Sequence, residues 1–510
     1  MKTIQPNHPV CALSRRRFIE IGALSMAAAG ASLHGADIEP KPTIGLQIAP
    51  FNILDEGVDA CLERVDDVAA VNTLFIYSHT YYGIPYTRTA NVLAGDHGYQ
   101  PRNDKDRSLW PVWVRHNPKE YSETTLKFNA QPKNTEHYGR DVFAETIEPA
   151  RRRGIKVYAR LLEPGRLDVQ GRIENFVDVT SVNLFGKLAN QPCRHNPNYR
   201  AWCQAMVRDL FQNYDLDGYQ WGAERIGPLA GLLSHGATPG CFCEHCIKRA
   251  QEEGVDPSRA RQGYTEMHTL IQSVGENNPR PSKGVMNTLL GIVIRYPEIV
   301  AWEHLWRKGV EEVAESIYTT IKSIKPSTQV GRHIDSKGTT LNPVTRAGTD
   351  YLAMTNYSDF IKPILYHDVM APRIVDHFLN QWRAGTFSEL DQDTLYEVFL
   401  AFNGYQSLKL PEVSQLFHTS LPAEYVGHET QRLVEEVSGQ ADILPGIGMD
   451  VPHRSGGLFT RSPQDFEVLG ETIRLSKEAG ARGVVASREY DEMRMPTLKA
   501  FGDAVRKHFG

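Results

Sequence analysis

The chain has 510 residues, of which 41% are hydrophobic and 23% are charged, and its formal net charge is −5 at pH 7. This composition is that of an ordinary globular protein, and the length is compatible with one large α/β barrel. Because no long run of Lys and Arg follows the first twenty residues, we expect no nucleic-acid partner, since binding of that kind needs a clustered basic face.

The N-terminal segment Ser14–Ala36 has the pattern of an export signal. Arg15 and Arg16 form an arginine pair, and an Ala-rich apolar stretch and then small residues follow. This order is typical of a Tat signal, and the apolar stretch is too short for a stable membrane span. We therefore predict that residues 1–36 are a Tat signal, read by the Tat export machinery and then removed. The mature protein is expected to be periplasmic or secreted, with no stable membrane span after cleavage.

From residue 43 onward, short apolar runs alternate with segments of helical period. Runs rich in β-branched and aromatic residues predict strands, and apolar residues three or four apart predict amphipathic helices. A helical insertion is expected at about residues 244–325, after the fourth strand. Asn196 directly before Pro197 predicts the N-cap of the helix that leads into the fourth strand. The predicted strands are 44–51, 72–80, 156–163, 217–224, 327–335, 350–368 (a strand with its loop), 441–450 and 483–493.

Eight strands that alternate with helices predict a (β/α)8 TIM barrel of the α/β class over residues 43–510. An open doubly wound sheet is the alternative. The first predicted strand is not followed by G-x-G-x-x-G, and this argues against a dinucleotide-binding sheet.

The active site of such a barrel lies at the carboxyl ends of its strands, and there the sequence is rich in carboxylates, aromatic rings and cations. Carboxylate pairs carry out acid–base and nucleophilic chemistry at glycosidic bonds. Aromatic rings offer flat faces to sugar C–H groups, and Arg and Asn bind hydroxyl groups. The predicted substrate-binding residues are Tyr81, Trp221, Arg225, Asp335, Asp359, Lys362, Arg454 and Glu489.

Glu224 is the first candidate for a catalytic residue, because it directly follows the fourth predicted strand. Its neighbour Trp221 would desolvate the carboxyl group and raise its pKa toward that of a general acid. Arg225 would instead hold the carboxylate charged, so the residues leave both roles open.

The second catalytic carboxylate is harder to choose from the sequence. Four acidic residues lie near predicted strand ends, namely Asp335, Asp359, Asp450 and Glu489. We predict Asp450, because a carboxylate on the seventh strand would face the fourth strand across the barrel mouth.

Three stretches together resemble the glycoside-hydrolase-like barrel proteins that are common among exported bacterial proteins. The stretches are DLDGYQWGAERIGPL followed by CFCEHCIKRAQEEGVD, the earlier QPCRHNPNYR, and GVVASREYDEM near the C-terminus. The resemblance covers most of residues 43–510 and implies a barrel fold and hydrolysis of glycosidic bonds. Where related glycosidases have an Asn-Glu pair after the fourth strand, this chain has Ala223 and Glu224.

The C-x-C-x-x-C cluster, Cys241, Cys243 and Cys246, lies in a loop that enters a helix. Three or four such ligands would bind a structural zinc ion. In an oxidising compartment, a disulfide with one free thiol, or pairing with Cys193 or Cys203, is the alternative. Either arrangement would fix the loop that carries Glu224.

The sequence thus predicts an exported carbohydrate-active enzyme, a glycoside hydrolase that acts on a carbohydrate substrate and needs no cofactor for catalysis. A metal-dependent sugar isomerase or epimerase is a second hypothesis, with Glu163, His333, Asp335 and Glu489 as ligands. A carbohydrate-binding barrel without catalysis is a third. Phosphoryl transfer and serine-hydrolase chemistry find no support, because the chain has no phosphate-binding loop motif and no G-x-S-x-G.

Overall fold

The computed structural model describes residues 41–79, 96–98, 113–128, 133, 137–167, 169, 172–276, 278–455, 458–461 and 464–510. The predicted signal segment and Tyr81 lie outside these residues.

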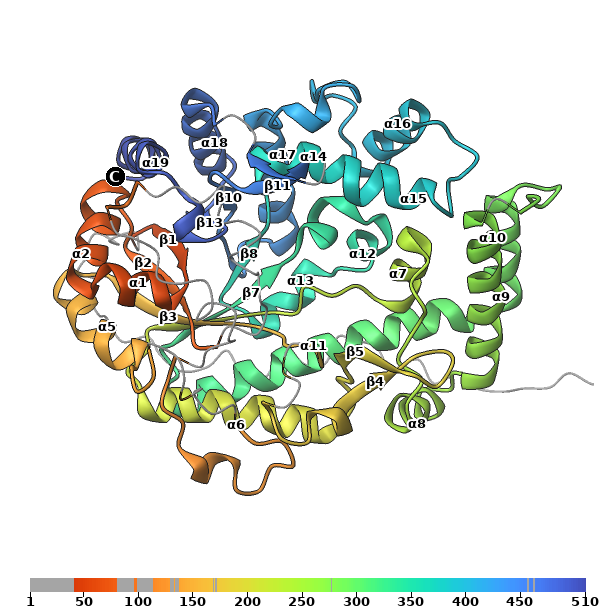
Figure 1. Cartoon of the computed structure of the whole chain (residues 1–510), viewed down its shortest axis with the longest axis horizontal. Helices are drawn as coiled ribbons and strands as arrows, with labels where there is room; N and C mark the ends of the chain where they lie inside the picture. Colours follow the sequence, from red (N-terminus) through yellow and green to blue (C-terminus); the bar gives the residue numbers. More distant parts are fainter. Residues whose placement is uncertain are drawn as a thin grey trace, which may run out of the picture. The chain divides into compact units, whose positions relative to one another are not determined.

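A single parallel sheet forms the centre of the fold (Figure 1). Its order is β10-β13-β1-β2-β3-β6-β7-β8-β9. The two outermost strands of this order, β9 and β10, are separated in the chain only by Leu444 and Pro445, so the two ends of the sheet meet and the sheet curls as in a TIM-like barrel. The strands are β1 (Thr43–Ile48), β2 (Thr73–Tyr77), β3 (Lys156–Leu162), β6 (Gly218–Gly222), β7 (Gln329–Ile334), β8 (Phe360–Pro363), β9 (Asp442–Ile443), β10 (Gly446–Gly448) and β13 (Gly483–Ser487).

Each strand falls within one of the predicted runs, apart from Thr43, which begins β1 one residue early. The seventh predicted run holds both β9 and β10, and Pro445, which has no N–H to donate, lies between them. In the sixth run the strand covers only Phe360–Pro363, because α13 (Tyr351–Met354) precedes it. Asp359 therefore lies before β8, at the amino ends of the strands.

Helices follow or precede the strands and pack around the sheet (Figure 1). The predicted cap is confirmed, since the Asn196 side chain accepts a hydrogen bond from the Asn198 N–H and Pro197 opens the helix. The helices besides α13 are α1 (Pro50–Glu56), α2 (Val58–Glu63), α5 (Val142–Arg152), α6 (Pro197–Asn213), α7 (Pro228–His235), α8 (Glu244–Glu252), α9 (Pro257–Gly275), α10 (Val285–Arg295), α11 (Glu298–Ile324), α12 (Pro343–Ala347), α14 (His367–Arg373), α15 (Gln381–Arg383), α16 (Gln392–Asn403), α17 (Ala423–Val437), α18 (Phe466–Glu478) and α19 (Met495–His508).

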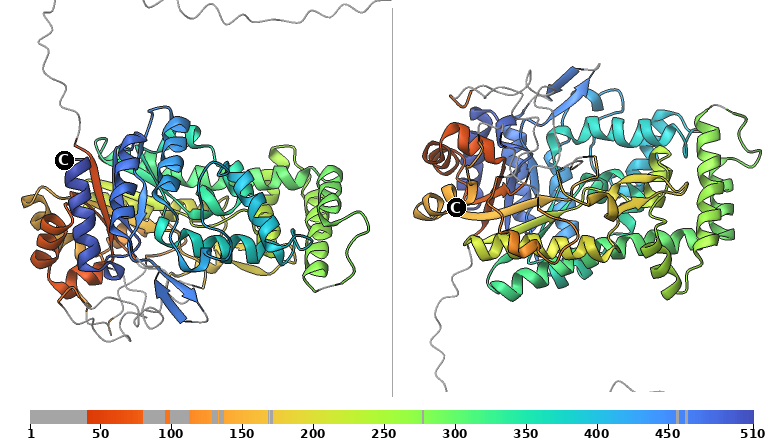
Figure 2. Two further views of the ribbon diagram at one scale, coloured as in Figure 1. Left: turned by 90° about the horizontal axis from the view of Figure 1, so that it is seen from above. Right: turned by 60° about the horizontal axis from the view of Figure 1, so that its bottom comes forward.

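Helices α7 to α11 lie between β6 and β7. Their apolar residues form a hydrophobic cluster of their own, with Tyr264 and Trp302 among its buried members. α9 and α10 lie side by side, away from the strands of the main sheet (Figure 2), whereas α11 packs against α6 beside the sheet. That residues 244–325 are an insertion stays a prediction. In the part of the chain that the structure describes, no helix has the length and apolar character of a membrane span.

Side chains of alternate residues fill the interior of the curled sheet. Phe75, Tyr158, Phe360, Leu444 and Val485 form one buried cluster from five strands. Because successive strand residues face opposite sides, the residues two positions further along point inward one layer closer to the carboxyl ends. This layer is polar, and it includes Tyr77, Arg160, Lys362 and Ser487.

Two short antiparallel pairs stand apart from the main sheet. β4 (Thr180–Val182) pairs with β5 (Leu188–Pro192), and β11 (Pro452–Ser455) pairs with β12 (Leu458–Arg461). The β4–β5 pair leads directly to Cys193 and then to α6, so it connects the third strand of the barrel to the helix before the fourth.

Candidate active site

An open cavity of about 450 Å³ lies at the carboxyl ends of the parallel strands. Small-molecule sites usually measure about 300 to 1,000 Å³, so the cavity has room for a sugar. Tyr77 and Arg160 reach it from within β2 and β3, and Glu224, Asp335 and Glu489 follow β6, β7 and β13 within two residues. The predicted substrate-binding residue Arg225 lines the cavity as well.

Glu224 is placed by the turn that ends β6. Its φ is +32°, a conformation that non-glycine residues rarely adopt and that is found often at functional sites. The carboxylate lies 2.8 Å from Nε2 of His333, and a third of the side chain is exposed. Burial would raise the pKa of Glu224, but the hydrogen bond from His333 and the charges of Arg160 and Lys337 hold this pKa well below its usual range.

His333 is fully buried at the end of β7, behind Glu224. Burial and the neighbouring Lys362 lower the pKa of His333 to about 4. The imidazole is therefore neutral at pH 7, and its Nε2–H donates to Glu224. A neutral donor and nearby cations both favour the charged carboxylate, so Glu224 is ionised in the resting protein.

Glu489 has the opposite environment. It is almost fully buried after β13, accepts a hydrogen bond of 3.1 Å from the Tyr77 hydroxyl, and lies 4.0 Å from the Arg160 guanidinium. Burial, with a smaller contribution from Asp491, raises the pKa of Glu489 to about 7, although Arg160 and Arg488 act against this rise. A carboxyl group with such a pKa holds its proton near neutral pH and can give it away.

The cavity thus holds two carboxyl groups whose environments move their pKa values apart. This is the arrangement by which one carboxylate acts as a nucleophile or base while the other acts as an acid. Glu489 was one of four candidates for the second catalytic carboxylate but was predicted as a substrate-binding residue, because its sequence neighbours do not reveal the burial that raises its pKa.

Two further predicted binding residues lie at this site. Asp335 lines the cavity and forms an ion pair of 3.2 Å with Lys337. Lys362 is fully buried beneath it and donates a hydrogen bond of 2.9 Å to the hydroxyl of Tyr366, which lines the cavity. Lys362 therefore supports the site from inside the barrel.

Asp450, the predicted second catalytic carboxylate, is absent from the described lining of the cavity. Its carboxylate is buried and accepts a hydrogen bond of 2.8 Å from the backbone N–H of Arg494. It also forms an ion pair of 2.7 Å with the guanidinium of Arg494. Both contacts join the end of β10 to the start of α19, so Asp450 has a structural role.

Trp221 and Asp359 are also misplaced by the sequence prediction. Trp221 belongs to the hydrophobic core outside the sheet, where Arg332 lies over its ring at 4.5 Å. Asp359 lies at the amino ends of the strands, where it accepts a hydrogen bond of 2.8 Å from the Val330 N–H and pairs with Lys322 at 2.7 Å. Neither side chain can reach a sugar in the cavity. Arg454 lies on β11.

Several cavity residues were not predicted as binding residues. Tyr77 and Arg160 could have been found from the alternation of strand residues, since they lie two positions beyond the interior Phe75 and Tyr158. Lys337, Tyr366, Arg373 and His377 lie in loops and helices, where no periodic pattern points to the barrel mouth. Arg488 directly follows β13, within the predicted run 483–493.

The ligand set of the isomerase hypothesis does not assemble. Within the described residues, Glu163, His333, Asp335 and Glu489 form no group with mutually close ligand atoms. Glu163 instead lies against Arg194, which donates to it from Nε at 3.0 Å, and against the Tyr199 hydroxyl at 2.9 Å.

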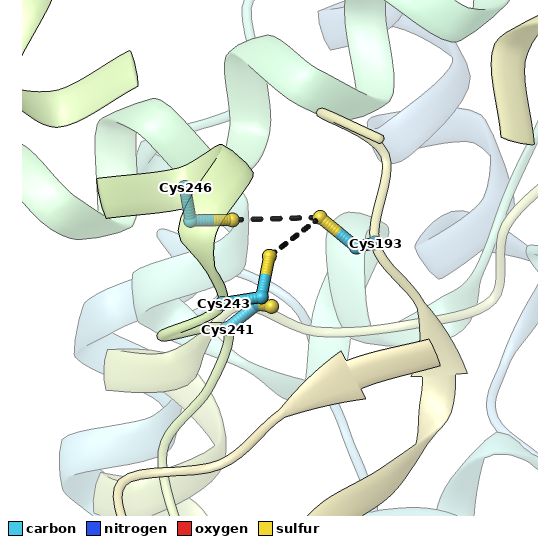
Figure 3. A group of neighbouring side chains, drawn as sticks. All are labelled: Cys193, Cys241, Cys243 and Cys246. Carbon is cyan, nitrogen blue, oxygen red and sulfur yellow. Dashed lines mark hydrogen bonds between the residues drawn. The ribbon is translucent and has the colours of Figure 1, made fainter. Parts of the chain in front are cut away.

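Four cysteines form a second cluster (Figure 3), and none of them is among the described residues that line the cavity. Cys193 follows β5, Cys241 and Cys243 lie in the loop before α8, and Cys246 lies in the first turn of α8. Their sulfur atoms all lie within 4.8 Å of one another, and Cys193 Sγ is 3.4 Å from Cys243 Sγ and 3.6 Å from Cys246 Sγ. The sequence prediction named three of these residues as metal ligands and considered Cys193 only as a disulfide partner.

The residues present fit a closed zinc site. Four thiolates at Zn–S distances of about 2.3 Å surround structural zinc as a tetrahedron, and sulfur separations in this cluster are of the size that such a tetrahedron needs. All four cysteines are free, and two of them, Cys193 and Cys241, are buried.

No family model matches this sequence, and no curated protein matches it either. Among solved structures, the chain is similar to α-L-fucosidase isoenzyme 2 from Paenibacillus thiaminolyticus, with 13% identity over 91% of this chain and 49% of that chain and a TM-score of 0.45. It is also similar to the PgaB (BpsB) glycoside hydrolase domain from Bordetella bronchiseptica, with 11% identity over 92% and 99% of the two chains and a TM-score of 0.43. The catalytic domain of β-amylase from Paenibacillus polymyxa shows 10% identity over 91% and 98%, with a TM-score of 0.46. The chain spans about half the length of the fucosidase.

Proposed function

We propose that this protein is an exported glycoside hydrolase that acts on a carbohydrate substrate, with Glu224 as the ionised carboxylate and Glu489 as the general acid. One observation carries the proposal: two carboxyl groups line one cavity at the carboxyl ends of the strands, and their surroundings favour opposite protonation states. Glycosidic bonds are cleaved by such a pair.

In the proposed reaction, Glu489 gives its proton to the leaving oxygen as the bond to the anomeric carbon breaks. Glu224 either attacks that carbon or takes a proton from the water that does so. Arg160 lies beside Glu489 and Lys337 contributes to the charge around Glu224, so cations surround the centre at which negative charge shifts. Retention or inversion at the anomeric carbon, followed by NMR of the first product, distinguishes the two roles of Glu224.

The test is a panel of chromogenic glycosides and polysaccharides, given to the wild type, Glu224→Gln and a control variant. Glu424→Gln is a suitable control, because Glu424 is exposed on α17 and lies outside the cavity. We expect Glu224→Gln to lose at least about a hundredfold in kcat, and Glu424→Gln to match the wild type. A wild type that binds sugars and cleaves none of the panel would instead indicate a carbohydrate-binding barrel without catalysis.

We further propose that Cys193, Cys241, Cys243 and Cys246 bind one structural zinc ion, which plays no part in the chemistry. The ion would join the segment before α6 to the loop before α8. That segment continues into Arg194, the partner of Glu163 at the end of β3, so the zinc would stabilise one wall of the barrel mouth.

Metal analysis and a thiol count of the purified protein test the zinc proposal together. We expect about one zinc per chain, lost in Cys193→Ser but kept in Cys203→Ser, whose sulfur lies outside the cluster. Fewer free thiols than expected after denaturation without reductant, together with no zinc, would support a disulfide.

Export is proposed from the arginine pair and the Ala-rich apolar stretch that follows it. Fractionation of cells that produce the wild type or an Arg15→Lys, Arg16→Lys double variant tests it. The wild type is expected outside the cytoplasm, and the variant should accumulate inside. Equal distribution of the two proteins would count against the Tat route.

A further inference from the structure

The cavity has more positive than negative charge along its described lining. Five arginine and lysine side chains line it, compared with three carboxyl groups. One of these carboxyl groups, that of Glu489, is the proposed proton donor. The cations are Arg160, Arg225, Lys337, Arg373 and Arg488, and the carboxyl groups are those of Glu224, Asp335 and Glu489.

Three of these cations have a carboxyl group within 4.0 Å. Arg488 lies 3.0 Å from Glu492, and Lys337 lies 3.2 Å from Asp335. Arg160 lies between the Tyr77 hydroxyl and Glu489. Each of these three cations therefore already has a partner within the protein.

Arg373 differs from them. It is the last residue of α14, it is partly exposed, and it lines the cavity. Its guanidinium lies 5.5 Å from the centre of the Tyr366 ring, and no hydrogen bond or ion pair joins it to any described residue. Asp335 and Asp368 act on this guanidinium through their charges but form no ion pair with it, so its N–H donors are available to a ligand.

An aromatic platform for a neutral sugar is less developed. Trp221 belongs to the core outside the sheet, and the rings that line the described cavity are Tyr77, Tyr366 and the imidazole of His377. Tyr77 and Tyr366 are both buried and already hydrogen-bonded, to Glu489 and Lys362 respectively. The cavity therefore offers charge more readily than flat apolar surface.

We propose that the cavity binds an acidic carbohydrate, a sugar that carries a carboxylate or sulfate group, and that Arg373 receives this group. The fork of N–H groups on a guanidinium matches two oxygens of a carboxylate or sulfate. A neutral sugar would remove water from Arg373 without supplying a countercharge, which is unfavourable. The inference rests on the proposed function, because it identifies the substrate class of the same cavity.

The experiment measures binding in Glu224→Gln, so that turnover is not needed for the readout. Calorimetry compares matched neutral and acidic sugars: glucose, galactose and mannose, their uronic acids, and their 6-sulfates. We expect at least one acidic sugar to bind about 10- to 100-fold more tightly than its neutral counterpart, the range expected for a hydrogen-bonded charge pair. Its affinity should fall as salt is raised, while that of the neutral sugar should not.

A second substitution, added to Glu224→Gln, assigns the preference to Arg373. Arg373→Met should remove it, Arg373→Lys should keep part of it, and Arg383→Met should leave it intact, because Arg383 is exposed on α15 outside the cavity. Melting temperatures confirm that each variant is folded. The uronic acid and sulfate arms show which anionic group is accepted.

Equal affinity for neutral and acidic sugars would overturn the inference, as would a panel in which no acidic sugar binds or an Arg373→Met variant that weakens both kinds alike. Failure of the wild type to cleave any glycoside, with the acidic preference intact, would count against the proposed function only.

Discussion

Replacing Glu489 by Gln gives the sharpest test of the acid–base assignment. Burial raises the pKa of Glu489 from 4.5 to about 7. At pH 7 about half of the molecules then hold the proton, compared with about 0.3% for an unperturbed carboxyl group, a gain of roughly 150-fold in the active acid form. Above pH 7 the acid loses its proton, so the kcat/KM of the wild type should decline as pH rises through neutrality.

The Glu489→Gln variant keeps the size of the side chain and removes the proton that can be donated. With substrates that have poor leaving groups, such as natural disaccharides, we expect kcat/KM to fall by about 10² to 10⁴. With 2,4-dinitrophenyl glycosides the loss should be small, because this leaving group departs without protonation. The decline of kcat/KM above pH 7 should also vanish, since the group that causes it is gone.

Glu492→Gln is the matched control for this assay. Burial also raises the pKa of Glu492, to about 8, and Glu492 lies beside Arg488 at 3.0 Å, but it is not among the described cavity-lining residues. The control should keep the decline near neutral pH. If Glu489→Gln retains that decline, or loses equal activity with good and poor leaving groups, the assignment of Glu489 as the acid is refuted.

Three predictions concern stability. Burial raises the pKa of Asp368 from 3.8 to about 7, so the folded state holds a proton that the unfolded state releases, and stability declines as pH rises from about 4 to 7. Asp368→Asn should remove this decline and raise the free energy of unfolding by at most about 4 kcal/mol above pH 7. Urea unfolding at pH 4 and pH 8 measures this, and a variant that gains no stability at pH 8 would contradict the prediction. Trp221→Ala should reduce the free energy of unfolding by about 3 to 5 kcal/mol without changing which acidic or neutral sugar is preferred, and an altered preference in the calorimetric panel would place the indole at the site after all. Asn196→Ala should reduce the free energy of unfolding by about 1 kcal/mol, while Asn198→Ala, which keeps the cap acceptor, should have the smaller effect; equal losses would exclude a capping role.

Local patterns predicted most of the fold. The apolar runs located every strand of the main sheet but not the two short antiparallel pairs. The Asn196–Pro197 pair located the start of α6, because strand pleating and helix capping depend on residues only a few positions apart. The same patterns placed Glu224 at the end of β6, at the face where a barrel carries its chemistry.

The side of the sheet to which a residue points was harder to predict. Trp221 and Gln220 are adjacent and both buried, yet Gln220 lies near Gln47, with 3.5 Å between their side-chain amides, whereas Trp221 packs outside the sheet. The outer face of the sheet packs against the apolar faces of helices, whereas the interior near the carboxyl ends is polar. Of two adjacent strand residues, the polar one therefore points into the interior. The sequence analysis assumed the reverse for Trp221.

The sequence by itself determined the order of strands and helices, the position of Glu224 and the three clustered thiols. Only the tertiary structure brought Cys193 to those thiols across 50 residues and joined Asp450 to Arg494 across 44. It also decided the protonation of Glu489, whose pKa depends on burial and on Arg160 from another strand. The physical reason is that burial and charge act through space, so the chemistry of a carboxyl group depends on neighbours that only folding assembles.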